Sequence, residues 1–219
     1  MMVNASALFA SCIPLVVLLV APRSSLSFSP SGVASRSFAR RHRHFGSAAS
    51  TVPLAEADAN LRTVFDFADA NADATVNFER IDDAIMGGIS LSALKNTTQD
   101  FASWSGICRT DGGGFCGMRT LPFREPLDAA GSRGLFVDCR LASDDEPERR
   151  VWKITCRVDG SRGEMVYQAA FPMPKGAEFS RVFVPFDDFQ LVRGPRVVPG
   201  APKLNVTNGI YQSEFVHLR

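Results

Sequence analysis

Histidine is almost missing from this sequence beyond its first 55 residues. Of the three histidines, His42 and His44 lie inside that first stretch, and only His217 follows it. A Ser-His-Asp or Cys-His catalytic arrangement would depend on that one residue, and a site with several histidine ligands cannot form. We therefore expect a protein that is not an enzyme and has no catalytic residues.

Metal and nucleotide motifs are absent as well. The cysteines after residue 55 have no pair at the two-to-four-residue spacing of a zinc knuckle; they are Cys108, Cys116, Cys139 and Cys156. No Gly-x-Gly-x-x-Gly phrase opens an expected helix; the match from Gly112 to Gly117 leads into an expected strand, which argues against a dinucleotide-binding turn. We expect no metal, no cofactor and no small-molecule substrate. Cys108 and Cys116 flank a glycine-rich turn, which leaves a redox pair open as an alternative.

Acidic residues are missing from residues 1–55, which contain five arginines. Of the 24 basic residues, 19 remain beyond this stretch against 23 acidic ones, a net charge of −4. A nucleic-acid-binding domain normally has a basic surface, so we expect no nucleic-acid partner.

Residues 1–55 have the features of a targeting presequence, which we expect to be unstructured and to precede the folded domain. The apolar run at 7–21 has the length of a signal-peptide core and is shorter than a membrane span. The Ser-, Arg- and Ala-rich residues 23–50 resemble a transit peptide, with Phe28 as the expected first residue after signal cleavage. This two-part layout favours a plastid; a mitochondrion is the alternative, followed by plain secretion.

Carboxylate pairs and one glycine-rich turn have structural explanations. Neighbouring residues of an extended chain point to opposite faces, so the carboxylates of Asp82 and Asp83 should diverge instead of forming a catalytic pair. We expect them to have a structural role, such as anchoring the turn before Met86, Gly87 and Gly88. A phosphate-binding loop should open a helix, whereas a strand follows the glycines at 112–114. We expect residues 101–110 and 115–120 to form a hairpin about this turn.

Short alternating segments separated by turns predict an all-β sandwich or jelly roll. The expected strands are residues 64–67, 89–94, 101–110, 115–120, 135–141, 151–158, 165–171, 181–184 and 210–218. Residues 193–209, with Pro195, Pro199 and Pro202, should be an irregular loop.

Four phrases follow one another along the chain. They run from Asp82 to Ser90 (Asp-Asp-Ala-Ile-Met-Gly-Gly-Ile-Ser), from Arg109 to Phe115, from Tyr167 to Phe171 and from Val184 to Phe189. Their most characteristic residues are Asp82, Asp83, Met86, Gly87, Gly88, Ser90, Gly113, Gly114, Phe115, Pro185, Phe186 and Phe189. In this order the four phrases resemble the complex I intermediate-associated protein 30 family.

The resemblance implies a galactose-binding-like jelly roll over residues 60–219 and a non-enzymatic chaperone for assembly intermediates of an organellar membrane complex of the complex I type. Its partners would be proteins, with at most a peripheral contact to the membrane. A plastid photosystem biogenesis factor is an alternative. The family pattern usually continues beyond residues 210–218 and has a Trp where this chain has Phe179, so the fold should lack its last strand or strands.

Arg193 and Arg196 are our candidate partner contacts, since arginine is enriched at interfaces. A carbohydrate-binding module is a further alternative. It would need exposed aromatic platforms, which only Trp104, Trp152, Tyr167 and Tyr211 could supply.

Overall fold

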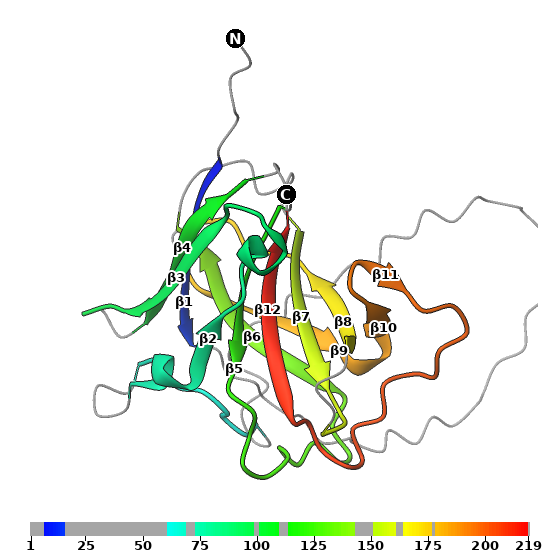
Figure 1. Cartoon of the computed structure of the whole chain (residues 1–219). Helices are drawn as coiled ribbons and strands as arrows, with labels where there is room; N and C mark the ends of the chain where they lie inside the picture. Colours follow the sequence, from blue (N-terminus) through cyan, green and yellow to red (C-terminus); the bar gives the residue numbers. More distant parts are fainter. Residues whose placement is uncertain are drawn as a thin grey trace, which may run out of the picture.

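Two antiparallel sheets face one another in a sandwich, as Figure 1 shows. The computed structural model describes residues 61–68, 73–98, 101–109, 114–142, 151–160, 164–176 and 178–218, together with the backbone of residues 7–15. The all-β fold expected from the sequence is confirmed. Among the described residues, no helix has the length and apolar character needed to cross a bilayer.

The first sheet has the strand order β3-β4-β1-β6-β9. Its strands are β1 (Ala7–Leu15), β3 (Leu91–Asn96), β4 (Ala102–Cys108), β6 (Gly134–Leu141) and β9 (Ser180–Pro185).

The second sheet has the order β11-β10-β8-β7-β12-β5-β2. Its strands are β2 (Phe78–Arg80), β5 (Phe115–Thr120), β7 (Val151–Arg157), β8 (Met165–Phe171), β10 (Gln190–Arg193), β11 (Arg196–Val197) and β12 (Gln212–Leu218). In the described part of the chain, three short 3-10 helices accompany the strands: η2 (Ala74–Asn77), η3 (Asp83–Met86) and η5 (Phe186–Asp188).

Aromatic side chains fill the space between the sheets. Trp104 of β4 meets Trp152 of β7 edge to face, with ring centroids 5.6 Å apart, and both indoles are buried. Phe171 and Phe215 make a second T-shaped contact. Edge-to-face pairs of this kind add to the stabilisation that burial of the rings supplies.

The hairpin expected between residues 101–110 and 115–120 is wrong. β4 pairs with β3 and β1 in one sheet, whereas β5 pairs with β12 and β2 in the other. The connection therefore crosses from one sheet to the other. Residues 110–113, including Gly113, lie outside the described part of the chain. Glycine-rich turns suit both kinds of connection, which is why the local sequence could not distinguish them.

Two further expectations are corrected. Residues 64–67 form no strand; Phe65 and Phe67 are buried in the core without a ladder partner for their backbone. The segment 193–209, expected to be irregular throughout, contains the short strand β11, in which Val197 pairs with Val192 of β10. Most other strands begin and end within two residues of their expected positions.

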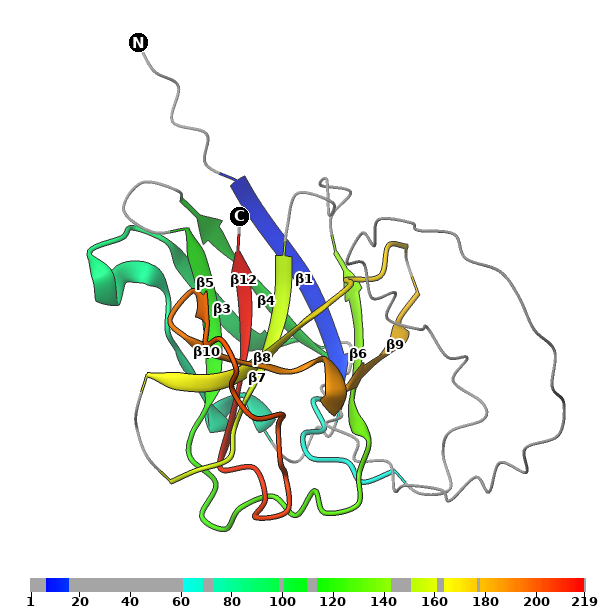
Figure 2. The ribbon, with the colours of Figure 1, turned by 90° about the vertical axis from the view of Figure 1, so that its right-hand side faces the viewer.

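The backbone of β1 lies between β4 and β6 and is antiparallel to both (Figure 2). This segment comes from the apolar run that the sequence assigns to the targeting presequence. It is the middle strand of the first sheet, because β4 and β6 are joined only through it in the strand order.

Candidate protein-binding site

Asp83 is held in the interior by three hydrogen bonds. Its Oδ1 accepts from the Ser90 backbone N–H at 2.8 Å, and its Oδ2 accepts from Ser90 Oγ at 2.6 Å and from the Gly114 N–H at 2.7 Å. Burial alone would raise the pKa of the Asp83 carboxyl, but these hydrogen bonds outweigh it and lower the pKa below its ordinary value. Asp83 is therefore ionised at neutral pH.

Asp82 makes a parallel set of contacts one residue earlier. Its Oδ2 accepts from the Ser92 N–H at 2.7 Å, and its Oδ1 accepts from Ser92 Oγ at 2.6 Å and from the Gly117 N–H at 3.2 Å. Arg80 Nε lies 3.4 Å from Oδ2. The two carboxylates thus bind different groups and do not converge on one point, as expected from their adjacency.

Together these contacts form what we call the aspartate clasp: Asp82, Asp83, Ser90, Ser92, Gly114 and Gly117. Ser92 belongs to β3 in the first sheet, and Gly117 belongs to β5 in the second. Ser90 and Gly114 lie just before the same two strands. The clasp therefore ties one edge of the first sheet to the second sheet.

The two glycines after η3 have separate geometric reasons. Gly87 ends the helix with φ of 86°, a left-handed conformation that suits glycine. Gly88 has no room for a side chain, because a Cβ there would lie 2.3 Å from Cγ of Asp83. The glycine pair therefore lets the chain turn tightly around the Asp83 carboxylate.

The same turn directs apolar side chains outward. Met86 is 64% exposed and Ile89 is 55% exposed, and Leu91 at the start of β3 is also 55% exposed. We call Met86, Ile89 and Leu91 the apolar rim. These three exposed apolar residues lie within six positions of one another in the sequence, and apolar groups that gather into one patch are a feature of protein-interaction surfaces.

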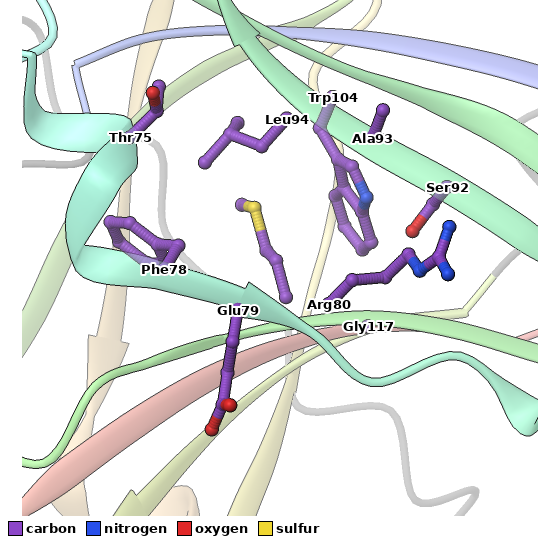
Figure 3. Close-up of a pocket in the computed structure, with 10 residues that line it drawn as sticks. Thr75, Phe78, Glu79, Arg80, Ser92, Ala93, Leu94, Trp104 and Gly117 are labelled. Carbon is purple, nitrogen blue, oxygen red and sulfur yellow. The ribbon is translucent and has the colours of Figure 1, made fainter. Parts of the chain in front are cut away.

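A cleft of about 300 Å³ opens beside the clasp, between β2 and β3. Phe78, Leu94, Trp104 and Met118 supply its apolar walls. In Figure 3 the Arg80 side chain extends toward Ser92, and Glu79 points away from the cleft. The cleft could receive an apolar side chain of a partner protein. Sequence reasoning missed it, because its lining comes from β2, β3, β4 and β5.

Cys108, Cys116 and His217 meet inside the sandwich. His217 is the β12 partner of Cys116 in the ladder, and all three side chains are buried. A side-chain hydrogen bond from Cys116 lowers the pKa of the Cys108 thiol. The pKa of the Cys116 thiol is raised, mainly by its contact with Cys108 and secondly by burial. The two thiols are thus brought together across the sandwich and not across a hairpin.

The Pro185–Phe189 phrase serves the crossover between the sheets. η5 connects β9 of the first sheet to β10 of the second, and the rings of Phe186 and Phe189 are buried 5.9 Å apart. The Phe186 N–H donates to the Arg133 carbonyl at 2.8 Å. These residues lie in the core, whereas Phe115 at the start of β5 is half-buried.

Arg193 and Arg196 face each other across the β10–β11 pair at the outer edge of the second sheet. Both are exposed, and Arg193 Nε lies 2.9 Å from Glu164 Oε2 in an ion pair open to solvent. The structure does not bring them together with the aspartate clasp as one site. They remain a separate candidate contact surface.

Most of the aromatic residues required by a carbohydrate-binding platform lie inside the protein. Trp104, Trp152 and Tyr167 are buried, and Tyr211 is half-buried. A sugar ring needs an accessible aromatic face, so these positions do not favour that alternative.

Comparison with known proteins identifies the family of this chain. No match is found among the curated proteins. Residues 65–218, most of the chain, match the sequence model of the family described as complex I intermediate-associated protein 30 (CIA30). This family consists of assembly factors with a role related to complex I, in an organellar, mitochondrial-type setting. The chain belongs to the CIA30 family.

Proposed function

We propose that this protein is a non-enzymatic chaperone that holds immature subunits of an organellar membrane complex of the complex I type, and that the apolar rim is its principal contact surface. One observation carries the proposal. The most specific family phrase places its two carboxylates in structural hydrogen bonds and turns Met86 and Ile89 toward solvent. The ionisable groups of the phrase are thereby committed to the fold, and its exposed groups are suited to apolar contacts.

A matched pair of variants tests the role of the rim. Met86→Ser with Ile89→Ser removes two of its three side chains, the two that precede β3. The control is Val76→Ser with Leu121→Ser, which removes two apolar side chains of similar exposure, 65% and 47%. Leu121 follows the last residue of β5, at the end of that strand away from Gly114 of the clasp. Each protein is expressed in the source organism, and crosslinking with mass spectrometry in isolated organelles identifies its partners.

We expect subunits of the membrane complex to crosslink to wild type and to the control pair. The rim variant should lose most of these crosslinks, because it no longer presents apolar side chains to the apolar surface of the partner. An Arg193→Ser and Arg196→Ser pair tests the second surface. Recovery of no complex subunits with wild type would overturn the function, and equal recovery with the rim variant would overturn the assignment of the site.

The compartment is tested separately. The two-part presequence favours a plastid, whereas the family favours a mitochondrial setting. Fusion of residues 1–55 to a fluorescent reporter distinguishes them. Plastid fluorescence would direct the search for clients to plastid complexes, including photosystem intermediates.

A further inference from the structure

The position of β1 divides the first sheet into two pairs of strands. β1 forms seven ladder pairs with β4, from Ala7–Cys108 to Ile13–Ala102. It forms three with β6, with an irregularity between Cys12 and Leu15 that contains Pro14. Without β1, the pairs β3-β4 and β6-β9 would face one another across a gap of about 10 Å, two strand spacings.

Each pair has its own anchor to the second sheet. The aspartate clasp ties β3 to β5 through Ser92 and Gly117. On the other side, η5 connects β9 to β10 and buries Phe186 and Phe189 in the core. Both walls of the gap therefore have attachments that do not depend on β1. We call the gap between β4 and β6 the strand slot.

The charged groups of β6 that lie opposite β1 are already paired or stacked. Asp138, opposite Leu15, forms a buried two-point ion pair with Arg181, with both N···O distances at 2.8 Å. The guanidinium of Arg140, opposite Cys12, lies 4.8 Å from the ring centre of Phe179. Asp138 is thus fully paired and needs no positive charge from a strand in the slot, whereas Arg140 Nε is buried with no hydrogen-bond acceptor among the described residues.

The segment that occupies the slot fits this requirement. Ala7–Leu15 reads Ala-Leu-Phe-Ala-Ser-Cys-Ile-Pro-Leu and contains no charged residue. It also lies in the apolar run that targeting would remove. If the presequence is removed on import, β4 and β6 present two facing rows of backbone donors and acceptors, which is a site for strand addition.

We propose that the strand slot is a strand-acceptor site, which β1 fills in the precursor and an extended, uncharged, apolar segment of an unassembled membrane subunit fills after the presequence is removed. The client segment adds antiparallel to both β4 and β6. This proposal rests on the proposed function and identifies the kind of client segment that the protein holds.

Peptide binding to the full chain tests the slot. The variant Phe9→Pro with Ser11→Pro removes backbone donors from β1 and opens the slot. The control variant Ser47→Pro leaves β1 unchanged. The probe is a fluorescent peptide of the sequence Ala7–Leu15 with solubilising lysines at its ends, followed by fluorescence polarisation. A second peptide has the same side chains but methylated backbone nitrogens at alternate positions.

We expect the opened variant to bind the first peptide at least about tenfold more tightly than wild type or Ser47→Pro, because their tethered β1 competes at an effective concentration on the order of mM. The methylated peptide should bind poorly, since it cannot complete the ladder. Equal binding of both peptides, or no binding of either, would overturn the proposal. Dimerisation of the opened variant would show a second copy as the occupant and would also overturn it.

A measurement on the wild-type chain covers the case in which the proline variant does not fold. Excess peptide should displace β1, so that amides of Ala7–Leu15 lose protection from hydrogen exchange while those of β4 and β6 keep theirs. Unchanged protection of β1 would overturn the slot. Client crosslinks in organelles without peptide binding would overturn the slot alone, whereas peptide binding without client crosslinks would support the slot and overturn the proposed function.

Discussion

The Asp83 carboxylate offers the sharpest test of the aspartate clasp. Asp83→Asn keeps the shape of the side chain and removes its charge. An amide has one accepting oxygen, so its NH2 group must face a donor, either the Gly114 N–H or the Ser90 N–H, that Asp83 now satisfies. One buried N–H is left without an acceptor, and the remaining bonds lose their ionic character.

These losses set the magnitude. An unsatisfied buried donor costs about 1–3 kcal/mol, and weakening a charge-assisted bond costs about 1 kcal/mol more, so we expect a loss near 3 kcal/mol. With a urea dependence of about 2 kcal/mol per M, the midpoint of unfolding should fall by about 1.5 M. The fluorescence of the buried Trp104 and Trp152 reports the transition.

The control is Asp187→Asn. Asp187 lies 3.3 Å from Lys203 in a pair open to solvent, and losing such a pair lowers the free energy of unfolding by at most about 1 kcal/mol. Because the folded pKa of Asp83 is lowered, its contribution is present above the unfolded value and is lost as pH falls through the folded value. The difference in the free energy of unfolding between wild type and Asp83→Asn should therefore be constant from pH 6 to 8 and become smaller below about pH 4. Equal midpoints for the two variants, or a gap unchanged at pH 3, would refute the clasp.

Two further predictions use the same unfolding assay. Gly88→Ala should lower the free energy of unfolding by about 2–4 kcal/mol, because the added Cβ collides with Asp83. At Gly87 an added Cβ meets open space, but φ is 86°, so Gly87→Ala should lower it by about 1 kcal/mol. Equal losses for the two variants would contradict the packing argument. Burial raises the pKa of Glu214 on β12 to about 7, although Arg119 and Arg157 lower it in part. Between about pH 4.5 and 7 the folded state therefore keeps a proton on Glu214 that the unfolded state has released. The free energy of unfolding should fall as the pH rises through this range. Glu214→Gln should remove this fall and gain about 1–2 kcal/mol at pH 8, and an unchanged pH profile would count against it.

The sequence predicted those strands that carry enough residues to show alternation. The boundaries of β5 and β8 agree with expectation because polar or glycine-rich turns bracket them. β2, β10 and β11 span only two to four residues, too few for a period of two to be recognised. Phe65 and Phe67 show the opposite problem, since an apolar alternation can pack into a core without joining a ladder.

The partners of each strand were much harder to predict than the strands. β5 pairs with β12, with Cys116 opposite His217, across about a hundred residues of sequence. Nothing local specifies such a pairing, and the glycine-rich turn after β4 suggested the wrong one. The anchoring role of Asp82 and Asp83 could be predicted from their adjacency, but the choice of Gly114 and Gly117 as donors depends on that distant pairing.

The clasp and the strand slot are connected through β3 and β4. If β1 leaves as proposed, the ladder with β3 is the backbone pairing that remains to β4 among the described strands, while Trp104 and Cys108 of β4 still pack against the second sheet. β3 is held to the second sheet by Ser92 and its bond to Asp82. Under the strand-slot proposal, a loosened clasp would remove one of the attachments that fix the β3-β4 pair, so that a client strand would pair less readily with β4 and β6 together. If both proposals hold, the carboxylates of the family phrase act on partner binding indirectly, by fixing one wall of the slot and by holding the apolar rim outward.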